Sequence, residues 1–266
     1  MRPSPEYQSE IARWREGRVR RLRSPGGWLT LVERRVLAEG PTDVPFGTVT
    51  VHRGQARLRV RAGAAVSIEG KALDDAGPER ILRTDEDAPA ETLTFEGRSY
   101  EVFRRGDVFA MRVKDPDAPA LRTFGGLEYF PLNPDWRIVA RFERYDPPRH
   151  TAHEYDIGTG SRRQVPGVAR FGAAGRALSL EPVLEEESDR LFFMFGDLTN
   201  RTESFPGGRF LYAERPAGDE VILDFNTAFN PPCAFTPHAT CPVTPTQNRL
   251  PVAIPAGELR YEATSS

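Results

Sequence analysis

Short stretches of alternating apolar and polar residues, separated by turn residues, constrain the fold of this chain more than any other feature. The first stretches lie between Gly47 and Lys114 and include GTVTVHR, ARLRVR, TLTFEG and DVFAMRVK. A period of two is typical of half-buried β-strands. Because the stretches follow one another too closely for crossover helices, the pattern predicts antiparallel strands in β-sandwich or β-barrel units.

Strand-like segments continue in the second half of the chain, such as DWRIVARFERY and EVILDFN, and RLFFMFGD is apolar enough to lie in the middle of a core. A Pro- and Asp-rich break, KDPDAPA at residues 114–120, lies between the halves and is typical of a unit boundary. With 266 residues, of which 39% are hydrophobic, the chain is long enough for one large domain or two modest ones. We therefore predict β-rich units at residues 26–115 and 116–266, or one continuous domain.

An amphipathic helix is predicted before the strands, over residues 6–23, within an N-terminal unit of residues 1–25. Four of its residues recur at spacings of three and four and share one face, namely Ile11, Trp14, Arg18 and Leu22. The other faces are rich in arginine. The net charge of the chain is −2 and its pI about 6.2, which favours a solvated helix over a nucleic-acid arm.

The cellular location is predicted from what the sequence lacks. We find no apolar run typical of a signal peptide and no stretch of about 18 apolar residues that would span a bilayer. We expect a cytoplasmic protein that binds neither membranes nor nucleic acid. Because cytoplasmic thiols stay reduced, Cys233 and Cys241 are expected to be free or metal-bound rather than joined in a disulfide. The oligomeric state does not follow from the sequence.

A long Pro-rich C-terminal loop is predicted where the alternation stops, after Asn226. Proline has no backbone N–H to give to a sheet, and the prolines concerned are Pro231, Pro232, Pro237, Pro242, Pro245, Pro251 and Pro255. Long ordered loops are often functional. The side chains of Asn226, Asn230 and Asn248 can each donate and accept hydrogen bonds, so they suit either a ligand or the loop's own backbone.

A second polar cluster precedes this loop in FGDLTNRTESFPGGRF. Asp197 and Thr199 follow the apolar run LFFMF, and Arg209 opens the next strand. If the flanking strands form a hairpin, Asp197, Arg209 and Asp224 converge near the start of the loop. An arginine between two carboxylates is typical both of a ligand clamp and of an ion-pair network, and the sequence leaves both open.

A span of nine residues in this loop contains two cysteines and one histidine, namely Cys233, His238 and Cys241. Zinc is a weak candidate, because structural zinc sites favour C-x2-4-C pairs and no fourth ligand is near, so we predict no metal or other cofactor. A cysteine nucleophile activated by His238 would need a lowered thiol pKa, which a sequence does not reveal. The third interpretation, which we prefer, makes the cysteines small apolar residues that pack the loop.

Three long motifs resemble a known family. FGDLTNRTESFPGGRFLY, DFNTAFNPPCAF and TCPVTPTQNRLPVAIPAGE are similar to segments of the uncharacterised prokaryotic proteins grouped as domain-of-unknown-function family 1684, and GWLTL, FAMRVKD and FGGLEYFPLNPDWRIVARF fit as well. The resemblance implies no established activity. It implies signature positions at Asp197, Thr199, Arg209, Asp224, Asn226, Asn230, Cys233, Cys241 and Asn248. Phe205, His238, Thr244 and Gln247 depart from the expected pattern, and the departure at His238 argues against its being an obligatory metal ligand or base.

Together these features favour a polar pocket that binds a small polar or anionic molecule. Arg209 would hold the anionic group, and further ligand contacts would come from Thr199, Asn226, Asn230 and Asn248. If the protein is an enzyme, hydrolysis is the reaction class to test, with Asp224 and Asp197 as the catalytic carboxylates. The alternative is a non-catalytic binding or scaffolding module in which the same residues brace an irregular loop.

Overall fold

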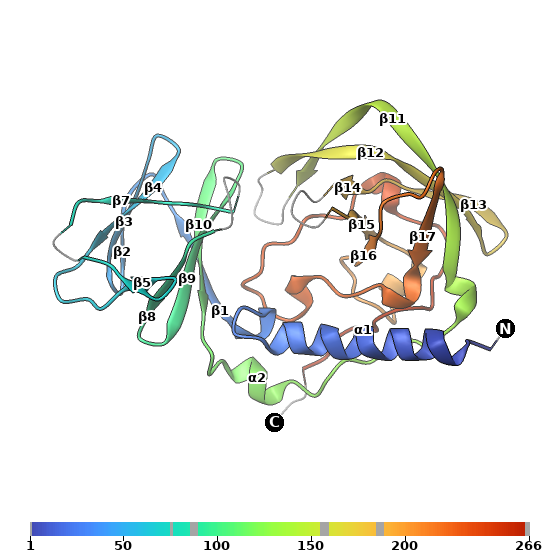
Figure 1. Ribbon diagram of the computed structural model, residues 1–266, viewed down its shortest axis with the longest axis horizontal. Coiled ribbons are helices and arrows are strands. Elements are labelled where there is room, and N and C mark those ends of the chain that lie inside the picture. The colour runs from blue at the N-terminus through green and yellow to red at the C-terminus, as the bar shows by residue number, and fades with distance from the viewer. Residues whose placement is uncertain (1, 75–76, 86–89, 155–159, 185–188, 264–266) are drawn as a thin grey trace.

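The protein is a mainly β structure in which every pairing between the named strands is antiparallel. The computed structural model describes residues 2–74, 77–85, 90–154, 160–184 and 189–263. One long helix precedes the strands, which form four open sheets (Figure 1). The predicted fold class, antiparallel β with an N-terminal helix, is confirmed.

Two sheets pack face to face in the first half of the chain. One has the strand order β1-β10-β9-β8-β5-β6 and the other β2-β3-β4-β7. The strands are β1 (Leu31–Leu37), β2 (Gly40–Val44), β3 (Gly47–His52), β4 (Gln55–Val60), β5 (Ser67–Ile68), β6 (Lys71–Ala72), β7 (Arg80–Leu82), β8 (Thr92–Phe95), β9 (Arg98–Arg105) and β10 (Val108–Lys114). Both sheets contribute to one buried cluster, in which the ring centroid of Phe46 lies 4.8 Å from that of Tyr100.

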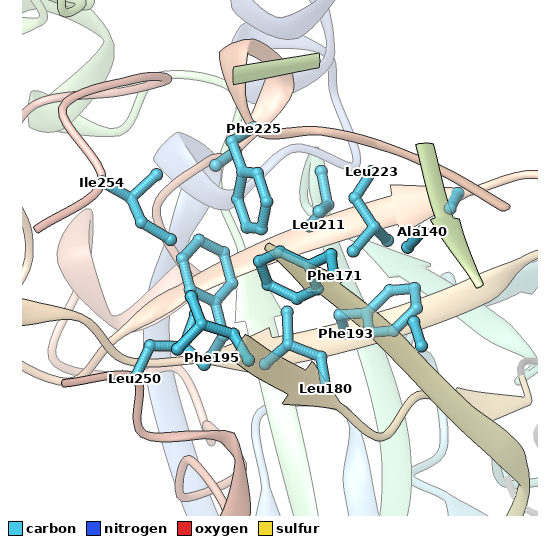
Figure 2. Packing of buried hydrophobic residues seen from close by; sticks show 14 of the residues in the cluster. Ala140, Phe171, Leu180, Phe193, Phe195, Leu211, Leu223, Phe225, Leu250 and Ile254 are labelled. Carbon is cyan, nitrogen blue, oxygen red and sulfur yellow. The ribbon is translucent and has the colours of Figure 1, made fainter. Parts of the chain in front are cut away.

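The second half contains a sheet of order β13-β12-β11-β17 and a smaller one of order β14-β15-β16. Its strands are β11 (Arg137–Glu154), β12 (Gly160–Ala173), β13 (Arg176–Leu180), β14 (Val183–Leu184), β15 (Leu191–Phe195), β16 (Arg209–Ala213) and β17 (Glu220–Asp224). All five residues of β15 are buried, as expected for its continuous apolar sequence. Figure 2 shows Phe193 and Phe195 of this strand packed with Phe171 and Phe225 in the main core.

Helix α1 (Pro5–Arg23) lies along the second half of the chain, beside β16 and β17 (Figure 1). It begins where Ser4 accepts a hydrogen bond from the backbone N–H of Tyr7 at 3.2 Å, with proline in the first turn. Ile11, Arg18 and Leu22 are buried on the predicted face. A further short helix, α2 (Pro119–Thr123), follows the first half. Among the described residues, no helix is long and apolar enough to cross a membrane.

The segment after β17 contains more structure than the single loop that we predicted. Three short 3-10 helices interrupt it: η4 (Phe225–Thr227), η5 (Pro232–Ala234) and η6 (Thr246–Asn248). Isolated bridges also tie it to earlier elements, pairing Phe229 with Phe210, Arg249 with Gly196 and Glu258 with Tyr129. Proline excludes this segment from the ladders of the sheets, but tight turns and single bridges satisfy much of its backbone.

Candidate functional site

Asp197 and Arg209 form an ion pair that is closed to solvent. Asp197 caps η3 (Leu198–Arg201), and Oδ2 of its carboxylate lies 2.7 Å from Nη2 of Arg209, with both side chains 0% exposed. The same Nη2 donates to the carbonyl of Ile254 at 2.9 Å, and Nη1 donates to the carbonyl of Ala256. The guanidinium therefore holds the backbone of the C-terminal segment rather than facing a cavity.

The second carboxylate oxygen of Asp197 is also bonded to backbone. Oδ1 accepts from the N–H of Thr199 at 2.9 Å and from that of Ile254 at 3.1 Å. Thr199 is buried, and its hydroxyl lies 2.7 Å from that of Ser204. The residues predicted as a catalytic carboxylate and a ligand contact thus lie together with Arg209 in one internal network.

Asp224 lies in a different network, at the end of β17. Its carboxylate accepts from the hydroxyl of Tyr7 at 2.8 and 2.9 Å and from Nη1 of Arg137 at 3.1 Å. The backbone N–H and side-chain amide of Asn226 donate to the same carboxylate at 3.1 and 3.2 Å. The Asn226 amide also donates to the carbonyl of Asn133 at 2.8 Å. Burial raises the pKa of Tyr7, and the charge of Asp224 raises it further, which keeps the phenol a donor.

Asn230 belongs to a third network, which anchors α1. Its backbone N–H donates to Oε2 of Glu258 at 2.7 Å, while Oε1 of Glu258 lies 2.9 Å from Nε of Arg18. Nη2 of Arg18 donates to the carbonyl of Asn230 at 2.8 Å, and the Asn230 amide donates to the carbonyl of Leu259 at 2.7 Å. Burial raises the pKa of Glu258, and the charge of Arg18 opposes that shift.

Asn248 braces two neighbouring segments. Its amide donates to the carbonyls of Glu181 and Met194 at 2.8 and 2.9 Å, and its side-chain oxygen accepts from the N–H of Glu181 at 2.9 Å. Asn248 is 1% exposed, so its side-chain amide bonds to backbone groups and does not face solvent. A buried asparagine that satisfies three backbone groups is typical of a structural role.

The two cysteines lie close together beside β1. The N–H of Cys233 is 3.2 Å from Sγ of Cys241. Cys241 is buried with Leu31 and Ala239, and Cys233 packs against this cluster. His238 donates its backbone N–H to the hydroxyl of Thr236 at 3.2 Å. Within the described part of the chain, no three His, Cys, Asp or Glu residues are arranged to hold a metal ion.

The predicted convergence of Asp197, Arg209 and Asp224 on one shared hollow is therefore wrong. Asp197 and Arg209 point into the protein toward the C-terminal backbone, whereas Asp224 faces the N-terminal helix. The alternation of side chains between the two faces of a strand explains the difference. Asp224 and Ile222 lie on one face of β17, and the buried Leu223 and Val221 lie on the core face. Arg209 lies on the core side of β16, in line with Leu211 and Ala213.

A hollow of about 790 Å³ lies between α1, the residues that follow it, β16 and β17. Helix positions 10, 14, 18 and 21 form one wall, and Tyr212, Ile222 and Asp224 lie opposite. Of the predicted site residues, Asp224 alone appears among the residues that line this hollow. Its volume is in the range of small-molecule sites, which is about 300–1,000 Å³.

One end of the hollow carries positive charge from Arg21 and Arg190. Burial lowers the pKa of Arg21, and the neighbouring charges of Arg18, Arg190 and Arg20 lower it further, whereas the charge of Glu258 opposes the shift. The Arg190 guanidinium lies 4.4 Å from the centroid of the Tyr212 ring. Within the described residues, neither Arg21 nor Arg190 pairs with a carboxylate.

The other arginines of this hollow are neutralised. Arg18 pairs with Glu258, Arg137 with Asp224, and Arg215 with Asp189. The hollow was not predicted, because the arginines of the helix were expected to be solvated. A signal was present in the spacing of Glu10, Trp14, Arg18 and Arg21, which places a mixed aromatic and cationic stripe on one helical face. Arg190, however, lies 169 positions further along the chain than Arg21 (190 − 21), and no local pattern connects the two.

Comparison with known proteins gives a family but no activity. A family model described as "Protein of unknown function (DUF1684)" matches residues 122–259, slightly more than half of the chain. The motifs GWLTL and FAMRVKD, which we compared with that family, lie before the matched range. A similar solved structure is the solution NMR structure of an uncharacterised protein of Haloarcula marismortui, with 32% identity and a TM-score of 0.45 over 55% of this chain and 82% of that one.

No curated protein matches the sequence. The predicted resemblance is confirmed by the family model. Its range includes the three long motifs FGDLTNRTESFPGGRFLY, DFNTAFNPPCAF and TCPVTPTQNRLPVAIPAGE. The chain belongs to the DUF1684 family of proteins of unknown function.

Proposed function

We propose that the protein binds a small anionic molecule in the hollow beside α1. The observation that carries this proposal is the pair of guanidinium groups, Arg21 and Arg190, at one end of the hollow without a carboxylate partner in the described part of the chain. Arginines that lie near one another repel. A phosphate or carboxylate between them would neutralise it and accept charge-assisted hydrogen bonds.

The geometry favours binding over hydrolysis. Asp224 is the predicted catalytic carboxylate that lines the hollow, and a general base needs a lone pair directed at the proton that it removes. Both oxygens of Asp224 already accept hydrogen bonds from Tyr7, and Arg137 and Asn226 donate to the same carboxylate. The second predicted carboxylate, Asp197, is 0% exposed. We therefore propose a binding protein, in which these carboxylates brace the fold.

The proposal is tested by thermal denaturation and calorimetry with inorganic phosphate and pyrophosphate as probes. We expect pyrophosphate to raise the melting temperature of the wild-type protein, because a ligand that binds the native state stabilises it. The double variant Arg21→Gln/Arg190→Gln should bind at least about tenfold more weakly, since hydrogen bonds to charged groups contribute about 1.5–3 kcal/mol each.

The matched control is Arg13→Gln. Arg13 is exposed on the same helix and does not line the hollow. Its substitution removes the same charge from α1 and should leave pyrophosphate binding within about twofold of wild type, because Arg13, unlike Arg21, lies outside the hollow and its charge is screened by salt. Equal losses in the control and the double variant would attribute binding to the general charge of the helix and refute the site. Absence of any anion-dependent stabilisation at millimolar concentrations would refute the function.

A further inference from the structure

Aromatic and aliphatic side chains line part of the hollow beside α1. Among its charged residues, the hollow is lined by the aromatic residues Trp14, Trp28, Tyr212 and Phe229 and by Leu22 and Ile222. Ile222 is 46% exposed although it lies in the wall of a concave surface. A site for inorganic phosphate or a sugar phosphate would need polar groups at these positions, whereas an apolar ligand would bury them.

Charge is distributed unequally along the hollow. Arg21 and Arg190 lie near one another, whereas Glu10 and Asp224 share the single partner Arg137 and so retain a net negative charge. The carboxylates of Glu214 and Glu220 also line the hollow. Along α1, Arg21 follows Trp14 by seven positions, which corresponds to about 10 Å of helix at 1.5 Å per residue. A ligand with one anionic end would be accommodated, and a ligand with negative charge at both ends would meet the net negative charge that Glu10 and Asp224 retain beside Arg137.

We propose that the ligand is an amphipathic anion, with a single phosphate or carboxylate head between Arg21 and Arg190 and an apolar body that extends about 10 Å over Trp14 and Ile222. This inference rests on the proposed function and adds the chemical class of the ligand. The hydrophobic effect supplies affinity in proportion to the apolar area that is removed from water, so the body of the ligand contributes more than the head as it lengthens.

The test is a calorimetric series of butyl, hexyl and octyl phosphate below their micellar concentrations, with inorganic phosphate as the reference and octanoate as the carboxylate arm. Each added methylene should tighten binding about fourfold, the equivalent of about 0.8 kcal/mol. A preference for octyl phosphate or for octanoate identifies the head group, and either preference supports the proposal. Octyl phosphate that binds no better than inorganic phosphate would overturn it, while leaving anion binding at this site intact.

A pair of variants separates the hollow from general surface adsorption. Ile222 and Val139 are cross-strand partners on the same outer face of the sheet, 46% and 59% exposed. Ile222 lines the hollow, and Val139 is not among its lining residues. Ile222→Asn should abolish the gain from butyl to octyl phosphate and leave inorganic phosphate binding unchanged, whereas Val139→Asn should keep the gain. Equal effects of the two substitutions would overturn the proposal.

Discussion

Removal of the Arg209 guanidinium is the strongest test of the buried ion pair. In Arg209→Met the flexible side chain occupies much of the same volume, but the carboxylate of Asp197 loses the partner that lies 2.7 Å away. The carbonyls of Ile254 and Ala256 lose their donor as well. Both side chains of the pair are 0% exposed, so water does not replace the lost contacts.

The expected loss is large on the scale of a folded domain. Breaking a buried ion pair by removing one partner costs about 3–5 kcal/mol, because it leaves an uncompensated buried charge. The whole free energy of unfolding is typically about 5–15 kcal/mol. Adding Asp197→Asn to Arg209→Met removes that charge and keeps the acceptor for the backbone N–H of Thr199. We therefore expect the double variant to lose at least about 1 kcal/mol less than the sum of the single variants.

The assay is equilibrium urea unfolding followed by tryptophan fluorescence. Arg201→Met is the matched control, because Arg201 is exposed on η3, which Asp197 caps, and surface substitutions usually change stability by less than about 0.5 kcal/mol. A loss below about 1 kcal/mol in Arg209→Met would refute the argument that this arginine holds the C-terminal segment. It would also reopen the interpretation of Arg209 as a ligand clamp.

Two further predictions concern pH and backbone conformation. Burial raises the pKa of Glu258 above its ordinary value of 4.5, so the native state holds that proton more tightly than the unfolded state. The stability of the wild type relative to Glu258→Gln should therefore decline as the pH rises above about 4.5, and urea titrations at several pH values check this; a constant or rising difference contradicts it. Gly208 has φ +99°, and a Cβ there would lie 2.6 Å from the carbonyl oxygen of Phe195. The control is Gly54→Ala, because Gly54 has φ +72° and nothing lies within 4 Å of a Cβ there. Gly208→Ala should have a melting temperature well below that of the control, because only this substitution adds a clash to the cost of a positive φ. Equal melting temperatures would contradict this.

The fold was predictable from the sequence because its signals are local. Alternation in the first half gave the strands, and the continuous apolar run LFFMF marked β15 as buried on both faces. The spacing of Ile11, Arg18 and Leu22 marked the buried face of α1. The short 3-10 helices near the C-terminus were missed, since prolines that exclude a strand are equally compatible with an extended loop and with tight turns.

The arrangement of the candidate site was less predictable. Sequence position marked Asp197 and Arg209 as polar residues beside strands and Asn248 as an asparagine of the Pro-rich segment, but it does not show whether such a side chain bonds to a ligand or to backbone. Burial decides that question, and burial depends on which face of a strand each residue occupies after the sheets have packed. The cationic end of the hollow requires Arg21 and Arg190 to be brought together by the whole fold.

The anchoring of α1 by Glu258 also has a consequence for synthesis of the chain. Arg18 and its partner are separated by 240 positions, so at roughly 5–20 residues per second a ribosome makes the partner about 12–48 s later. The β-sandwich, whose buried cluster draws only on residues 37–113, has all its contacts available much earlier. Nascent α1 therefore acquires its anchoring ion pair only after the residues of the β-sandwich cluster have been made.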